Sequence, residues 1–296
     1  MWWKRVVAAS VSVALMAGMV LGLQAAEKPK LKALIIDGQN GHDWKSTTPV
    51  LKKILEETGL FQVDVATSPP KGADMSGFKP NFAAYDVVVS NYQGDEWPEE
   101  TKKALVDYVA GGGGLVIYHF ALAAFPNWKE WNEMIGLGGW GGRNEKHGPY
   151  VYWQDGKIVY DNSPGKAGGH GPAQEFVLDV RCPDHPIMQG LPPRFAHVKD
   201  ELYGWLRGPA KNLTVLATAF APKEKGGSGR HEPLLFTVQY GKGRVFQNAL
   251  GHTAQQLKSV AFIVTFQRGC EWAATGKVTQ KVPPDFPGPD KPSVRE

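Results

Sequence analysis

Cysteine is scarce in this sequence, which contains only Cys182 and Cys270 among its 296 residues. The two residues do not have the paired spacing of a zinc ribbon. They permit one disulfide in an oxidising compartment, and two buried free thiols satisfy the sequence equally well. Neither a zinc ribbon nor an obligatory disulfide is therefore predicted.

The chain also lacks blocks of like charge. Its formal net charge is +4, and its lysine and arginine residues are scattered along the sequence. No basic block accompanies a stripe of aromatic residues, as it would on a surface that binds nucleic acid. Nucleic acid is therefore not an expected partner.

Long apolar runs are absent except at the N-terminus. Lys4 and Arg5 precede an apolar run over residues 6–23, and small residues close it. This order is typical of a secretory signal peptide. An uncleaved membrane anchor is the alternative, because the run reaches the ~18 residues at which a spanning helix becomes feasible. We expect a signal peptide over residues 1–26, a periplasmic or secreted protein, and no stable membrane span after cleavage.

Strand and helix patterns alternate through the first half of the chain. Apolar runs typical of buried strands cover residues 32–38, 61–66, 85–90 and 115–119, and helices are predicted over residues 47–60 and 98–109. This β-α-β-β-α-β order predicts an α/β protein whose parallel sheet is covered by helices on both faces.

The second half is less regular. It contains a predicted short helix over residues 127–135, hairpins over 151–160 and 234–250, a strand over 213–219 and a closing helix over 260–274. Mixed or antiparallel strands are therefore expected to extend the parallel core. We predict one domain over residues 31–275, followed by a proline-rich, charged tail over residues 276–296.

Polar residues follow several of the predicted strands. In open α/β sheets, ligands bind beyond the carboxyl ends of the strands, so these residues are candidates for a functional site. The fold is expected to bring them to one edge of the sheet, although they are distant in sequence. They are Asn40, His42, Asp43, Asn91, Tyr92, His119 and His252.

Five short segments in a fixed order carry a resemblance to a known family. They are residues 41–45, 112–119, 184–192, 200–203 and 240–253. Together they resemble the ThuA-like, or trehalose-utilisation, family over about residues 31–275. The resemblance implies a three-layer, flavodoxin-like fold of the class I glutamine amidotransferase-like superfamily. It also implies a role in carbohydrate use, linked with trehalose catabolism and with 3-keto sugars.

One departure from the amidotransferases is informative. Those enzymes have a cysteine at the sharp turn after the glycine-led strand, where this chain has Tyr118 and His119. The nearest cysteine in the sequence is Cys182. Since a thiolate nucleophile is missing from the turn, we predict that the protein is not a glutamine amidotransferase.

We expect His119, Glu201 and His252 to carry the chemistry. His119 follows a strand at a turn that should expose its side chain, and His252 lies in a Gly-His-Thr turn. Glu201 precedes aromatic residues instead of lying on a solvated helix face. Histidine suits an acid or a base near neutral pH, and Glu201 could be the base. The alternatives are a helix cap, a loop-fixing hydrogen bond and a loop salt bridge.

Further candidates are expected to bind the substrate. Aromatic rings stack on the C–H faces of sugars while polar neighbours recognise the hydroxyls. Helix capping is the alternative for His42 and Asp43, and ordinary packing is the alternative for the aromatic residues. His147 and His170, in glycine-rich loops, are expected to be plain surface histidines, and the alternative is that they cover the site. The binding candidates are Asn40, His42, Asp43, Trp44, Tyr92 and Trp128.

Together with the carbohydrate role that the resemblance implies, these residues favour an exported enzyme that performs acid/base chemistry on a 3-keto sugar or glycoside, by isomerisation or β-elimination. A non-catalytic sugar-binding module is one alternative. A metal-dependent hydrolase is another, since histidines and a carboxylate from separate loops could hold zinc or another divalent ion. No His-x-x-x-His or Cys-x-x-Cys spacing supports a metal, and our expectation is a protein without a cofactor.

Overall fold

The computed structural model describes Met1, Trp2 and residues 30–296. The predicted signal peptide over residues 1–26 lies outside the described residues except for its first two positions. Among the helices that are described, none combines the length and the apolar character needed to cross a membrane.

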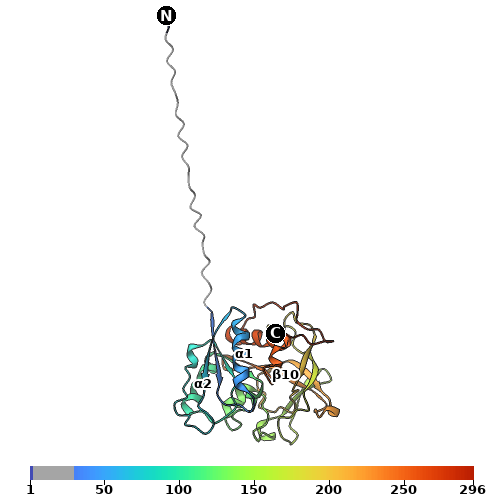
Figure 1. Cartoon of the computed structure of the whole chain (residues 1–296). Coiled ribbons are helices and arrows are strands. Elements are labelled where there is room, and N and C mark those ends of the chain that lie inside the picture. The colour runs from blue at the N-terminus through green and yellow to red at the C-terminus, as the bar shows by residue number, and fades with distance from the viewer. Residues whose placement is uncertain (3–29) are drawn as a thin grey trace.

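One mixed sheet of eleven strands forms the centre of the protein (Figure 1). Its parallel half has the order β2-β1-β3-β4-β11. The strands of this half are β1 (Leu31–Asp37), β2 (Phe61–Thr67), β3 (Val87–Ser90), β4 (Gly114–Tyr118) and β11 (Gly243–Asn248). β3 and β4 are buried over their whole length, as expected of parallel strands covered on both faces.

The other half of the sheet is antiparallel and continues from β11 in the order β10-β9-β7-β8, with the β5–β6 hairpin paired to β10. The strands are β5 (Tyr150–Gln154), β6 (Lys157–Asp161), β7 (Gln174–Val180), β8 (Arg194–Asp200), β9 (Leu213–Ala221) and β10 (Arg230–Tyr240). The predicted fold class, a flavodoxin-like parallel sheet with an antiparallel extension, is confirmed. β7 and β8 were not predicted from the sequence.

Four α-helices pack on this sheet: α1 (Trp44–Glu56), α2 (Glu99–Gly111), α3 (Lys129–Ile135) and α4 (Val260–Thr275). Short 3-10 helices are η1 (Phe82–Ala84), η2 (His119–Ala123), η3 (Glu145–His147), η4 (Lys223–Lys225) and η5 (Gln256–Lys258). Successive side chains of a strand point to opposite faces of the sheet, and two neighbouring residues of β11 each contact a covering segment. Both faces of the sheet are therefore covered. The amide of Asn248 bonds to Thr265 of α4, and that of Gln247 bonds to the Leu137 carbonyl after α3.

Helix α1 begins three residues earlier than the sequence pattern predicts. The Asp43 side chain accepts a hydrogen bond from the Ser46 backbone N–H at 3.3 Å and so caps the helix. Trp44 therefore lies in the first turn of α1.

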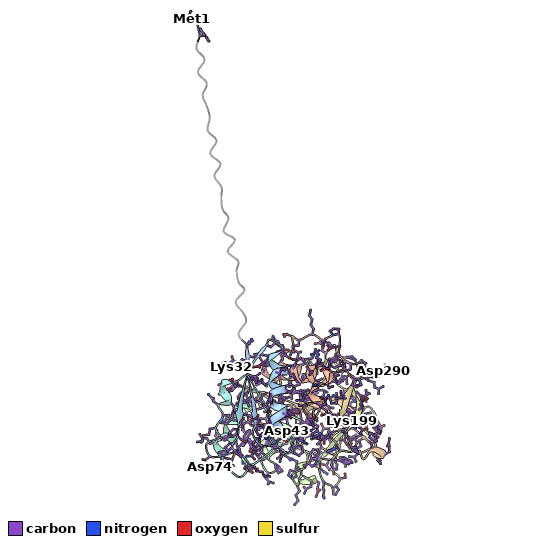
Figure 2. All side chains as sticks on the ribbon, in the orientation of Figure 1. Met1, Lys32, Asp43, Asp74, Lys199 and Asp290 are labelled. Atoms are coloured by element: carbon purple, nitrogen blue, oxygen red, sulfur yellow. The ribbon has the colours of Figure 1, made fainter. Side chains whose placement is uncertain are left out.

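The C-terminal segment after α4 lies against the body of the protein (Figures 1 and 2). Phe286 packs on Phe195 of β8 with ring centroids 5.2 Å apart, and the Gly288 carbonyl accepts a hydrogen bond from the Ala196 backbone at 2.8 Å. Cys182 and Cys270 are both free thiols.

Candidate functional site

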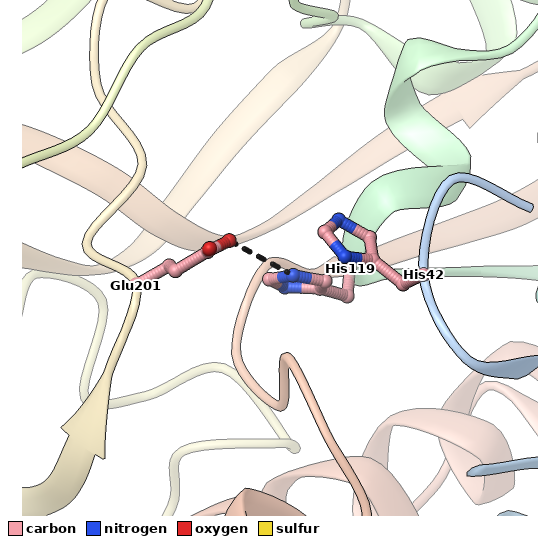
Figure 3. Close-up of side chains that lie close together, drawn as sticks. All are labelled: His42, His119 and Glu201. Carbon is pink, nitrogen blue, oxygen red and sulfur yellow. Dashed lines mark ion pairs between the residues drawn. The ribbon is translucent and has the colours of Figure 1, made fainter. Parts of the chain in front are cut away.

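Four histidines surround the carboxylate of Glu201 at one edge of the sheet. The Oε1 atom of Glu201 lies 3.0 Å from Nδ1 of His252 and 3.5 Å from Nε2 of His170. Its Oε2 atom lies 3.6 Å from Nε2 of His119. The ring of His42 completes the group, with its centroid 5.1 Å from that of His119 and 4.4 Å from that of His252. Figure 3 shows His42, His119 and Glu201 converging from separate segments.

The sheet topology explains why these residues meet. His42 follows β1, His119 follows β4 and His252 follows β11, and these parallel strands end at the same edge. Glu201 directly follows β8, at the far end of the antiparallel half. The structure thus brings together the three residues predicted to carry the chemistry and one predicted binding residue; their roles stay predictions.

His119 lies in a strained turn. Its backbone has φ of +44°, in the left-handed region that is uncommon for residues other than glycine. The expectation that this turn exposes the side chain is wrong, because His119 is only 1 % exposed and Tyr203 stacks on its ring with centroids 4.5 Å apart. The Nδ1 atom lies 2.8 Å from the Ala249 carbonyl. Since a carbonyl only accepts, Nδ1 carries the proton, and the lone pair of neutral His119 is on Nε2, toward Glu201.

Tyr203 is a member of the site that our reasoning from sequence missed. Its hydroxyl donates to Nε2 of His119 at 2.7 Å and lies 3.4 Å from Nε2 of His42. Burial, together with the charges of Glu201 and Asp200, raises the pKa of Tyr203 well above its ordinary value. The hydroxyl therefore remains a proton donor at neutral pH.

Asp200 holds the loops of Glu201 and His252 in place. Its fully buried carboxylate accepts backbone hydrogen bonds from Glu201 at 2.9 Å, Gly251 at 2.6 Å and His252 at 3.2 Å, as well as a bond from His197 at 2.8 Å. Burial acts to raise the pKa of Asp200, but the hydrogen bond and charge of His197 outweigh it and lower that pKa. Asp200 is therefore an ionised anchor between two strand ends.

The electrostatics of the site favour an ionised Glu201 beside neutral His42 and His252. Burial acts to raise the pKa of Glu201, but the nearby His119, His170 and His252 outweigh it and hold that pKa below its ordinary value. Burial and the neighbouring His119 and His252 lower the pKa of His42 to about 4. Burial also lowers the pKa of His252. At neutral pH the site therefore contains a carboxylate next to the neutral imidazoles of His42 and His252.

His170 is not the plain surface histidine that the sequence predicts. The loop before β7 pairs with the loop after β8, through reciprocal backbone hydrogen bonds between Gly169 and Gly204. This pairing places His170 beside Glu201. Trp140 covers both loops, with its ring centroid 4.6 Å from that of Tyr203 and 6.2 Å from that of His170.

Two predicted binding residues shape the loop of His42. The side-chain oxygen of Asn40 accepts a hydrogen bond from the His42 backbone at 2.9 Å, and its amide donates to the Asn91 side chain at 3.1 Å. Asp43 caps α1, as the alternative interpretation proposed. These contacts account for Asn40 and Asp43 without a ligand.

The aromatic candidates Tyr92 and Trp128 lie away from the site. Tyr92 is fully buried, stacks on Phe125 and donates its hydroxyl to the Asp95 carbonyl at 2.7 Å. Trp128 packs on Phe125 and Trp131 and is only 8 % exposed. The prediction that these two rings stack on a substrate does not fit this structure, because neighbouring side chains cover them.

Trp44 lies beside a cavity of about 750 Å³, a volume typical of small-molecule sites. The cavity is next to the His42 loop, at the carboxyl ends of β1 and β2, and its lining includes Asn40, Gly41 and Gln93. None of the four histidines lines it. The chemical groups and this cavity are therefore adjacent and do not coincide.

Comparison with known proteins identifies the family of this chain and two similar solved structures. The chain matches the family described as ThuA, trehalose utilisation, over residues 32–273. A crystal structure of a ThuA-like protein from Parabacteroides merdae is 51 % identical with a TM-score of 0.89, and the match covers 90 % of this chain and 98 % of that one. A ThuA-like protein from Bacteroides uniformis is 19 % identical with a TM-score of 0.58, covering 87 % and 96 %, and shows the fold alone. No curated protein matches the chain.

Proposed function

Since this chain belongs to the ThuA family of trehalose utilisation, which implies a role in carbohydrate metabolism, we propose that it is an exported enzyme that performs acid/base chemistry on a sugar. The proposed substrates are 3-keto sugars or glycosides. The family supports the substrate class, and the side chains around Glu201 support the type of reaction.

The observation that carries the proposal is one ionised carboxylate with an imidazole nitrogen beside each of its oxygens and the Tyr203 hydroxyl next to one of these rings. His252 lies 3.0 Å from one oxygen of Glu201, and His119 lies 3.6 Å from the other. The Tyr203 hydroxyl is hydrogen-bonded to His119. A base and acids within such reach of one another are what general acid/base catalysis requires.

A 3-keto glycoside suits these groups because its ketone acidifies the C–H bond at the adjacent carbon 2. Glu201 accepts that proton, the C–H electron pair forms the double bond between carbons 1 and 2, and the bond from carbon 1 to the leaving oxygen breaks. His252, 3.0 Å from Glu201, is the group available to pass a proton to the leaving oxygen, whereas His119 has its lone pair on Nε2 and can only accept a proton there. One proton is removed and one is delivered, so this elimination needs no further reactant. Returning the proton to carbon instead would give isomerisation.

The proposal is tested by comparing turnover with binding on one set of sugars. Trehalose, other glucosides and their 3-keto counterparts would be incubated with purified protein, with products followed by chromatography and binding followed by calorimetry. We expect turnover of 3-keto compounds and none of the parent glycosides. Binding without turnover would support a sugar-binding module instead, and absence of both would contradict a carbohydrate substrate of this class.

A further inference from the structure

We propose that His42, His119 and Glu201 bind a divalent transition-metal ion of the zinc type. The inference deepens the proposed function and rests on it only for the use of the ion, since the ion would lie in the same site. Metal binding itself can be measured without any substrate.

The three side chains converge as metal ligands do. One ligand atom from each of His42, His119 and Glu201 lies within 4.8 Å of the other two (Figure 3). His119 Nε2 and Glu201 Oε2 are 3.6 Å apart. Two ligands each ~2.1 Å from a tetrahedral ion would be ~3.4 Å apart, so this pair already has nearly the right separation. The His42 ligand atom lies within 4.8 Å of the other two, so it would have to move closer by at most ~1.4 Å to complete the set.

The Oε2 atom of Glu201 is buried without the hydrogen-bond partner that a buried oxygen normally has. Glu201 is 8 % exposed, and Oε2 is shielded from solvent without a hydrogen-bond partner among the described residues. At 3.6 Å its contact with His119 is too long for a hydrogen bond. Leaving a buried acceptor unsatisfied costs ~1–3 kcal/mol, and more for a charged group. A cation at this point would satisfy the oxygen.

The surrounding contacts resemble those that orient metal ligands. A metal-bound histidine usually donates its other ring N–H to a carbonyl or carboxylate, which fixes the tautomer and the ring direction. His119 does so through Nδ1 to the Ala249 carbonyl at 2.8 Å. The other oxygen of Glu201 lies 3.0 Å from Nδ1 of His252, and Asp200 holds the Glu201 backbone. Both ligands are therefore positioned by neighbouring groups.

The ligand set also selects the kind of ion. Two imidazoles and one carboxylate suit zinc and similar transition metals, whereas magnesium and calcium prefer oxygen ligands. Three protein ligands leave a coordination position for water or substrate, as in catalytic zinc sites. With the ion on Oε2, the other oxygen of Glu201 would still face His252 and could act as the base, whereas His119 would serve only as a ligand. His252, His170 and Tyr203 are outside the set and remain available for proton transfer. An ion would take the place of the Tyr203 hydroxyl as the partner of His119 Nε2.

Direct metal titration tests the site. Purified full-length protein would be treated with a chelator, dialysed, and titrated with Zn²⁺ by calorimetry, with Co²⁺ absorption as a second measurement because its intensity reports the coordination number. We expect one ion per chain and a raised melting temperature, since a ligand that binds only the folded state stabilises it. Failure to bind either ion at one per chain would overturn the inference.

Variants decide whether the ion occupies this site. His42→Ala, His119→Ala and Glu201→Gln should each weaken Zn²⁺ binding by at least ~100-fold, above the range for residues that only support ligands. His147→Ala, outside the site in η3, should bind as the wild type does, and Tyr203→Phe, which removes a hydroxyl that competes for His119 Nε2, should bind at least as tightly. Glu201→Gln is nearly isosteric, so it should fold even if a histidine variant does not. Unchanged binding by a folded Glu201→Gln protein would overturn the inference.

Activity separates this inference from the proposed function. Stoichiometric binding without turnover of any 3-keto glycoside would sink the proposed reaction and leave the metal site standing. Turnover by a protein that binds neither ion would sink the metal site and leave the acid/base function standing.

Discussion

The buried carboxylate of Asp200 accepts a hydrogen bond from Nε2 of His197 at 2.8 Å, and neither side chain is exposed to solvent. Nδ1 of His197 lies 3.0 Å from the hydroxyl of Ser259, at the start of α4. The same carboxylate bonds to the backbone of Gly251. One buried pair thus connects β8, the loop after β11 and the last helix, directly beneath the candidate site.

Replacing Asp200 by alanine should therefore destabilise the whole domain. Removing the Asp200 carboxylate would leave the buried donors of His197 and of the Gly251 backbone without partners, and each unsatisfied buried donor costs ~1–3 kcal/mol. Urea unfolding would measure the change in free energy. Asp107→Ala is the matched control, since Asp107 on α2 pairs with Lys103 on the surface, where the two side chains are 62 % and 75 % exposed. The control should cost about 1 kcal/mol or less. Equal losses for both variants would show that the Asp200 pair has no special role.

The three residues proposed to carry the chemistry should respond differently from Asp200. His119→Ala, Glu201→Gln and His252→Ala should each lower turnover of a 3-keto glycoside by at least ~100-fold, the usual cost of removing an acid or a base. The melting temperatures of Glu201→Gln and His252→Ala should change little, whereas His119→Ala removes a buried ring and should melt lower, so its turnover is measured well below that temperature. The histidine control is His147→Ala, which lies outside the site in η3. Turnover that survives all three changes would place the reaction elsewhere, and general unfolding would favour a structural role.

The sequence was sufficient to predict the parallel half of the sheet and which of the histidines meet at its edge. His42, His119 and His252 each follow an apolar strand, so the topology alone predicts that they meet at one edge. The strands β7 and β8 were missed because charged and partly exposed residues interrupt their apolar positions.

The rest of the site depends on contacts that no local pattern shows. Tyr203 and His170 join the site only because two irregular loops pair through Gly169 and Gly204. Tyr92 and Trp128 were assigned to binding because an aromatic residue near a loop looks the same in sequence whether its ring is covered or open. Burial in the aromatic cluster around Phe125 distinguishes the two cases.

Glutamine should not be a substrate. His119 occupies the turn after β4 at which the amidotransferases carry a cysteine, and Cys270 is fully buried in α4, where burial raises its thiol pKa. Neither position offers a reactive thiolate. Incubation with glutamine should release no ammonia above a buffer control. Ammonia release that alkylation of thiols abolishes would show that Cys182 or Cys270 acts as a nucleophile.

The proposed export predicts a new N-terminus. The charged start, the apolar run and the small residues that follow predict cleavage near Ala25 or Ala26. Protein recovered from the cell envelope or the medium should therefore begin within a few residues of that point when its N-terminus is sequenced. Recovery of the chain from the cytosol with an intact Met1 would contradict export.

Glu232 should make the stability of the protein depend on pH. It lies on β10 with 1 % exposure, packed beneath Gly204 in the loop that follows the candidate site. Burial raises its pKa from 4.5 to about 7, although bonds from Ser228 and the Trp205 backbone and the charge of Arg230 oppose the shift. The folded protein therefore holds the proton more tightly than the unfolded chain does.

The sign of the effect follows from this difference in proton binding. Below the unfolded pKa of 4.5 the carboxyl is neutral in both the folded and the unfolded state, so its ionisation does not lower the free energy of unfolding. As the pH rises to about 7, the unfolded chain ionises first and the folded state becomes less stable by up to about 3 kcal/mol, a cost that then stays constant. Glu232→Gln removes this titration. The variant should melt roughly 5–10 °C above the wild type at pH 8, with most of the gain absent at pH 5.

Calorimetric melting at the two pH values checks this prediction, and Glu56→Gln is its control. The Glu56 side chain is 43 % exposed and forms only a surface pair with Lys52, so its replacement should leave both melting temperatures nearly unchanged. A Glu232→Gln protein that is destabilised equally at pH 5 and pH 8 would show that the carboxyl is needed for its hydrogen bonds. In that case the cost of its buried charge would not govern stability at alkaline pH.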